Sequence, residues 1–125
     1  MFQQILDENL VRSGPICESA IYSIENGECR AASSDTLPKE IEFYHAFQRG
    51  GDLSNLSFGI DFNDAMYQPL KIDRSSTIGR NGETGIVVVR SMESLVVGIY
   101  REGVQASRAV KAVEQAANLL KGRGQ

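Results

Sequence analysis

The sequence predicts an α+β fold, in which a central antiparallel sheet of about six or seven strands carries the N- and C-terminal helices packed on one face. Segments with helical hydrophobic spacing lie at both ends of the chain, and segments rich in Val and Ile follow one another between them across short turns. The 125 residues are 42% hydrophobic and 23% charged, which is the balance of one globular domain. We therefore expect residues 1–125 to form a single domain.

Both terminal segments are expected to be amphipathic helices. Gly14-Pro15 ends the first helix, and Ser107 is the expected N-cap of the last helix, residues 106–120. Because each helix has one apolar face, a sheet face is the available surface on which to bury it. The apolar positions at helical spacing are Phe2, Ile5, Leu6 and Leu10 in the first helix and Ala109, Val113, Ala116 and Leu120 in the last.

A β-hairpin is predicted around Asn26-Gly27. This pair is a strong hairpin signal, because a type I′ turn needs φ > 0 at both central residues. With a two-residue loop, Tyr22 lies opposite Ala31. The same register places Arg30 on the face of Ala32, away from Tyr22.

The middle of the chain is predicted to contain one more helix and about five more strands. The helix starts within Thr36-Leu-Pro-Lys-Glu40 and ends at Gly50-Gly51. A second Asn-Gly turn is expected at Asn81-Gly82. The buried helix positions are Ile41, Tyr44 and Phe47, and the predicted strands are 19–24, 28–32, 56–62, 65–72, 76–80, 86–90 and 94–100.

Charge, hydropathy and cysteine spacing exclude several classes of protein. The net charge of −3 and isoelectric point of about 5.1 give no general attraction to phosphate, so we expect no nucleic-acid partner. The apolar runs are far shorter than the ~20 residues of a membrane span, and the acidic N-terminus does not suit a secretory signal, so we expect a cytoplasmic location. Cys17 and Cys29 are not spaced as zinc ligands and lie too far apart along the predicted ladder for a disulfide.

No residue pattern indicates an enzyme, a cofactor or a metal site. His45, the one histidine, has no serine or cysteine motif beside it, and we expect it on the surface or in helix packing. The glycines of residues 79–85 lack the Gly-Lys-Ser/Thr of a phosphate-binding loop, which favours a hairpin turn. Four scattered carboxylates match no known ligand spacing: Glu40, Glu42, Asp61 and Asp64.

Two surface features leave alternatives open. Cations spread over the later strands and turns, which gives either a basic face for an acidic protein or lipid surface, or ordinary solubilising charge. Phe2, Ile5 and Leu119 form either a small apolar groove between the terminal helices or simple helix–helix packing. The cations are Lys71, Arg74, Arg80, Arg90 and Arg101.

Four segments of the chain match the motifs of one known family. Gly82-Glu-Thr-Gly-Ile-Val-Val-Val-Arg-Ser and Ser94-Leu-Val-Val-Gly-Ile-Tyr-Arg-Glu-Gly-Val104 are similar to the last profilin hairpin and the start of the final helix. Phe2-Gln-Gln-Ile-Leu-Asp-Glu-Asn-Leu10 resembles the first helix, and Ala20-Ile-Tyr-Ser-Ile-Glu-Asn-Gly27 resembles the first hairpin. The resemblance covers nearly the whole chain and implies a profilin-like fold.

The resemblance implies a cytoplasmic, cytoskeleton-associated protein that binds and sequesters actin monomers. Profilins bind actin through the last three strands and the start of the final helix, bind proline-rich segments between the terminal helices, and in many cases bind phosphoinositides. Matching positions give the expected actin-binding residues Lys71, Arg80, Val104, Gln105, Ser107, Lys111 and Gln115. The positions carried over to the polyproline site are Phe2, Ile5, Arg30, Leu119 and Gln125.

The polyproline positions keep only one aromatic ring, that of Phe2. Proline-rich ligands dock as polyproline II helices on flat rings, and losing such an anchor commonly costs ~2 kcal/mol. We therefore predict weak or absent polyproline binding. The actin-binding positions keep cations at Lys71 and Lys111 and an apolar residue at Val104, so actin binding is expected to be retained.

A scaffolding function is the alternative. Small domains of the roadblock and longin type share the helix–sheet–helix sandwich, dimerise, and bind GTPases or trafficking partners. A dimer would favour this alternative, whereas a monomer, which we expect, favours the profilin interpretation.

Overall fold

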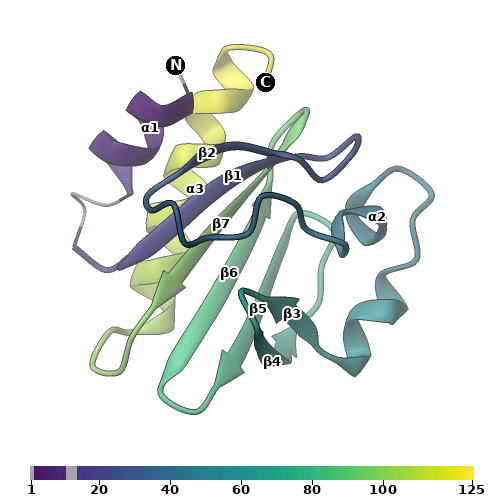
Figure 1. Cartoon of the computed structure of the whole chain (residues 1–125), viewed down its shortest axis with the longest axis vertical. Helices are drawn as coiled ribbons and strands as arrows, with labels where there is room; N and C mark the ends of the chain where they lie inside the picture. The colour runs from purple at the N-terminus through teal and green to yellow at the C-terminus, as the bar shows by residue number, and fades with distance from the viewer. Residues whose placement is uncertain (1, 11–13) are drawn as a thin grey trace.

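The computed structural model describes residues 2–10 and 14–125, which form one seven-stranded sheet with helices on both faces (Figure 1). The strand order is β2-β1-β7-β6-β5-β4-β3, and each neighbouring pair is antiparallel. This confirms the predicted α+β fold. The strands are β1 (Glu18–Ser23), β2 (Cys29–Ala32), β3 (Ile60–Phe62), β4 (Ala65–Lys71), β5 (Ser76–Asn81), β6 (Thr84–Arg90) and β7 (Ser94–Tyr100).

The two faces of the sheet are covered by different elements. Helices α1 (Phe2–Asn9) and α3 (Ala106–Gly122) pack on what we call the helix face, as predicted. The short helix α2 (Tyr44–Phe47) and the 3₁₀ helix η2 (Leu53–Phe58) pack on the opposite face. The central strands β6 and β7 are buried on both sides, which explains their nearly continuous Val and Ile runs.

The predicted register of the first hairpin is wrong. Tyr22 pairs with Cys29, and Ala31 pairs with Ile21, so Arg30 is an extra residue at a bulge in β2. Because a bulge changes which residues share a face, Ala32 packs against the core of the opposite face, whereas Arg30 lies over α1.

The turn chemistry also differs from the prediction. Gly27 has φ +76°, but Asn26 does not have a positive φ, so this pair is not a type I′ turn. The two-residue loop between β5 and β6 is Gly82-Glu83, because Asn81 pairs with Thr84. A tight turn with φ > 0 at both residues occurs instead at Asn63-Asp64.

The predicted middle helix is reduced to α2. Residues 39–41 are extended instead: the backbone N–H of Cys29 donates to the Lys39 carbonyl, and that of Ile41 donates to the Gly27 carbonyl. Tertiary pairing therefore overrides the local helix signal. Residues 56–58, predicted as strand, belong to η2, and the N-cap of α3 is Gln105 rather than Ser107.

Candidate functional site

Part of the helix face is not covered by any helix of residues 2–10 and 14–125. Helix α3 packs on β6 and β7, and Ile78 on β5 lies opposite Val87, whose side chain belongs to the core under α1 and α3. Ile78 therefore points to the helix face, and so does Lys71, its partner on β4. Arg80, two residues beyond Ile78, shares this face.

A groove of about 550 Å³ runs between β5 and α3. Ile78 lines it from the sheet, and Ser107, Lys111 and Gln115 line it from the helix. The spacing of four residues places these three side chains on one side of α3. These three are among the expected actin-binding residues. A fourth, Lys71, pairs across the strands with Ile78 and therefore lies next to the groove.

The cations of this surface are available to a partner. Lys71 Nζ lies 3.4 Å from Ser76 Oγ, and Arg80 Nε donates to the Gly82 carbonyl at 2.9 Å. Within residues 2–10 and 14–125, neither these two side chains nor Lys111 forms an ion pair. Burial raises the pKa of the nearby Tyr100 hydroxyl, and the positive charge of Arg80 partly opposes that rise.

The start of α3 contributes two of the expected residues. Gln105 is exposed at the N-cap, and its side chain makes no capping hydrogen bond. Val104 is half-buried against the core under α1 and α3. The sequence-predicted residues come from β4, β5, α3 and the two positions directly before α3, and we call them the β4–β5–α3 surface: Lys71, Arg80, Val104, Gln105, Ser107, Lys111 and Gln115.

Two exposed apolar side chains escaped the sequence interpretation. Phe58, at the end of η2, is 87% exposed, and Met66, on β4, is 53% exposed. Gln68 on β4 pairs with Arg80, so both side chains point to the helix face. Met66 lies two residues before Gln68 on the same strand and therefore points to the helix face as well. The sequence predicted a strand at residues 56–62. Because every second side chain of a strand is buried, that prediction did not indicate that Phe58 is exposed.

Two of the five cations proposed as a basic face have structural roles on the other side of the sheet. Arg74 donates to the carbonyls of Ala46, Gln48 and Gly51 at 2.6–3.3 Å. Arg90 donates to the Phe47 carbonyl at 2.7 Å. Both cap carbonyls at the end of α2, so the basic face predicted from the sequence loses Arg74 and Arg90.

The polyproline positions lie around the packed ends of α1, β2 and α3. Ile5 is only 2% exposed, so helix packing is the correct interpretation for this residue. The Arg30 guanidinium lies over the Phe2 ring, 5.2 Å from its centroid, and donates to Ser94 Oγ at 2.8 Å. Ser91 Oγ donates to the Gln125 carbonyl at 2.9 Å.

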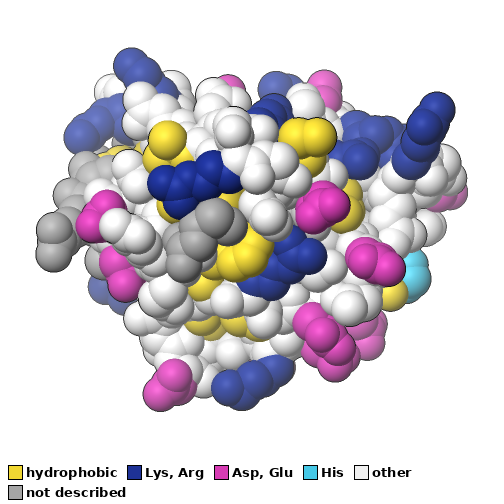
Figure 2. Space-filling view, turned by 90° about the horizontal axis from the view of Figure 1, so that it is seen from above, with side chains coloured by type: hydrophobic (Ala, Val, Ile, Leu, Met, Phe, Trp, Pro, Cys, Tyr) yellow, Lys and Arg dark blue, Asp and Glu magenta, His cyan; other side chains and the backbone are white. Residues whose placement is uncertain are grey.

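The described residues at this end of the molecule form no broad aromatic platform. Leu119 is 42% exposed, and Phe2 is half-buried. Figure 2, seen from above, shows hydrophobic side chains in small groups separated by Lys and Arg.

The remaining sequence expectations concern the two cysteines, the histidine, metal binding and membrane spans. Cys17 and Cys29 are free thiols, and His45 is exposed with its ring beside Tyr44. In the described part of the chain, no three metal-ligating side chains converge. No helix among those residues is long and apolar enough to cross a membrane.

Comparison with known proteins identifies the fold and the family. The family model described as Profilin matches residues 1–125. This chain belongs to the profilin family. The match favours the profilin interpretation over the roadblock and longin alternative.

Individual profilins agree with this assignment over the full chain. Profilin of Saccharomyces cerevisiae is 32% identical, and Profilin-1A of Acanthamoeba castellanii is 29% identical, each over 98% of both chains. The crystal structure of Acanthamoeba castellanii profilin II superposes with a TM-score of 0.89 at 25% identity, covering 100% of both chains. A mouse profilin IIa structure, in complex with a double repeat from the FH1 domain of mDia1, shares the fold at 18% identity and a TM-score of 0.69. Profilins bind actin and regulate its polymerisation.

Proposed function

We propose that this profilin binds actin monomers through the β4–β5–α3 surface and limits their polymerisation. The observation that supports the proposal is the groove between α3 and β5, which Ser107, Lys111 and Gln115 line together with Ile78, while Lys71 on β4 pairs with Ile78. The chain acts as a monomer in the cytoplasm, associated with the cytoskeleton, and needs no cofactor.

The chemistry of the surface suits an acidic protein partner. Lys71, Arg80 and Lys111 provide positive charge without internal ion pairs, and Ile78 provides apolar area between them. Charge complementarity mainly raises the association rate and selects the partner, while apolar contact at the centre supplies affinity. Met66 adds exposed apolar area on the same face of β4.

We further propose that polyproline binding is weak or absent. The mouse neighbour is described with an FH1 repeat, but here Arg30 covers the one aromatic ring and Ile5 is buried. A proline ligand would need to displace Arg30 from Phe2 and from Ser94 Oγ. A titration with a proline decamer is expected to give no saturable signal in the micromolar range, and micromolar affinity would contradict this proposal.

Anionic-lipid binding through Arg80, Arg90 and Arg101 stays a prediction. The structure weakens it, because Arg90 is bound to the Phe47 carbonyl on the opposite face. Flotation with liposomes, with and without phosphoinositide, tests it.

The actin proposal is tested by retention of purified actin monomers on the immobilised protein, followed by a polymerisation assay. We expect retention and a concentration-dependent decrease in filament formation. Failure to retain monomers from several sources, together with unchanged polymerisation, would contradict the proposal.

A further inference from the structure

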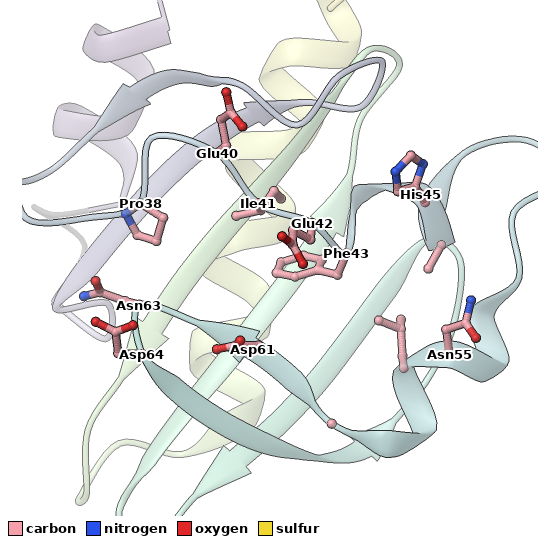
Figure 3. Close-up of a pocket in the computed structure, with 13 residues that line it drawn as sticks. Pro38, Glu40, Ile41, Glu42, Phe43, His45, Asn55, Asp61, Asn63 and Asp64 are labelled. Atoms are coloured by element: carbon pink, nitrogen blue, oxygen red, sulfur yellow. The ribbon is translucent and has the colours of Figure 1, made fainter.

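A second groove, of about 600 Å³, lies on the opposite face of the sheet, away from the proposed actin surface (Figure 3). Residues 38–46 form one wall, and η2, β3 and the turn after β3 form the other. Ile41 and Leu56 close its floor from the core, and the half-buried Phe43 adds an aromatic ring. The groove is therefore a depression with an apolar base, open to solvent.

The charged side chains that line this groove, among the residues that the structure describes, are carboxylates, and His45 lines it too. Glu40 and Glu42 come from one side, and Asp61 and Asp64 border the other, as Figure 3 shows. Asp61 pairs with Met66 and lies between the buried Ile60 and Phe62, so its side chain points away from the core of this face. Within residues 2–10 and 14–125, no Lys or Arg lines the groove. In the described ranges 2–10 and 14–125, none of these four carboxylates has a hydrogen-bond or ion-pair partner. The uncompensated charge and the apolar base together favour a ligand with cations on an aliphatic or extended framework.

The arrangement of the carboxylates argues against a single metal ion. No three of the metal-ligating side chains in the described residues come close enough together to hold one ion. The negative charges are distributed along the groove, so several cations spaced along a chain match them better than one point charge.

The sheet edge beside the groove is open to an added strand. β3 is the last strand of the sheet and pairs only with β4. The two-residue turn makes Phe62 and Ala65 a hydrogen-bonded pair, so Asp61, opposite Met66, occupies a non-hydrogen-bonded position. Its backbone N–H and C=O therefore point away from β4, toward the open edge, where an extended peptide can bind them.

We propose that this acidic groove, lined by Glu40, Glu42 and Phe43, binds an extended Arg- and Lys-containing segment of a partner protein as an added strand on β3. Backbone hydrogen bonds to Asp61 fix the peptide, and alternate side chains place their cations among the carboxylates. The aliphatic stems cover Ile41 and Phe43, and a guanidinium can stack on the Phe43 ring. The site is independent of actin binding, because it lies on the other face of the sheet.

The test uses a fluorescent peptide that alternates Arg with Val, titrated into the full chain and followed by anisotropy and by backbone amide NMR. We expect saturable binding, with the largest shifts at the amides of residues 59–63. The double variant Glu40→Lys/Glu42→Lys should weaken binding by about tenfold or more. The control Glu8→Lys/Glu83→Lys changes net charge equally but lies outside the groove, and it should bind as wild type does.

A second pair of variants separates strand addition from charge attraction. Asp61→Asn and Asp61→Pro both remove the carboxylate, but only the proline also removes the backbone donor at the open edge. Asp61→Pro should bind the peptide about threefold or more weakly than Asp61→Asn. Circular dichroism and retained actin binding verify that each variant is folded.

Three results would overturn the proposal. The first is equal loss of binding in the groove variant and in the charge-matched control. The second is equal peptide affinity in Asp61→Asn and Asp61→Pro. The third is binding of spermidine or Ca²⁺ at least as tight as that of the peptide, because either result would show that a small cation satisfies the groove.

Discussion

The β4–β5–α3 surface and the α1–β2 end differ in what their cations already bind. On the β4–β5–α3 surface, Lys71, Arg80 and Lys111 form no ion pair with the described residues; Lys111 lines the groove, and Lys71 pairs with Ile78, which also lines it. At the α1–β2 end, Arg30 lies over Phe2 and donates to Ser94 Oγ. A cation that the fold holds over a ring and against a buried hydroxyl is less available to a partner than an exposed cation. Residue type alone does not show this difference.

The largest loss of stability is expected from replacing Arg74, a cation that donates hydrogen bonds to three backbone carbonyls. Replacing Arg74 by alanine leaves the carbonyls of Ala46, Gln48 and Gly51 without their donor and should lower the free energy of unfolding by about 3 kcal/mol. Arg80→Ala, the matched control, should change it by less than about 0.5 kcal/mol. Urea unfolding followed by circular dichroism measures both, and equal destabilisation would break the distinction between used and available cations.

The next effect concerns actin affinity. The double variant Lys71→Glu/Arg80→Glu should lower the affinity for actin monomers by about 10- to 100-fold, because two attractive charges become repulsive. Unfolding midpoints should stay close to wild type, since both side chains are exposed. Isothermal titration with actin monomers measures the loss, and unchanged affinity would place the interface elsewhere.

A smaller effect is expected at the α1–β2 end. Arg30→Ala removes one charged hydrogen bond and one cation–π contact, so the free energy of unfolding should fall by about 1–2 kcal/mol. Actin affinity should be unchanged. If Arg30→Ala instead weakened actin binding as strongly as the Lys71→Glu/Arg80→Glu variant, the two surfaces would not be separate.

The smallest effect is a loss of stability in alkali. Burial raises the pKa of Tyr100, as it does those of Tyr22 and Tyr67. Above the ordinary tyrosine pKa of about 10, the unfolded chain releases protons that the folded chain keeps, so stability present below that pH is lost as the pH rises. Urea unfolding between neutral and strongly alkaline pH should show this decline, and Tyr100→Phe should make it shallower. A slope that is the same in the variant would exclude Tyr100 as a contributor.

The sequence predicted most elements where local pattern and tertiary structure agree. The helical spacing at both ends and the Val-rich central strands identify α1, α3, β6 and β7, because burial dictates both pattern and structure there. The middle helix was wrong because residues 39–41 pair with the first hairpin, a long-range contact that local propensity does not contain. The hairpin register was wrong because the bulge at Arg30 has no distinctive sequence signal.

The candidate site stays a prediction, and the sequence indicates only part of its geometry. Ser107, Lys111 and Gln115 line one groove because their spacing of four residues places them on one side of α3. The roles of Arg74 and Arg90 were not predictable, because they depend on carbonyls at the end of a helix that the sequence placed incorrectly. Phe58 was missed for the same reason, as its exposure follows from η2.

Affinity for actin monomers in Lys111→Glu, compared with Lys121→Glu, tests the central claim most directly. Both are exposed lysines on α3, but only Lys111 lines the groove beside Ile78. We predict that wild type and Lys121→Glu bind actin monomers equally and that Lys111→Glu binds about tenfold or more weakly. Equal affinity of all three proteins, or no binding by wild type, would contradict the account.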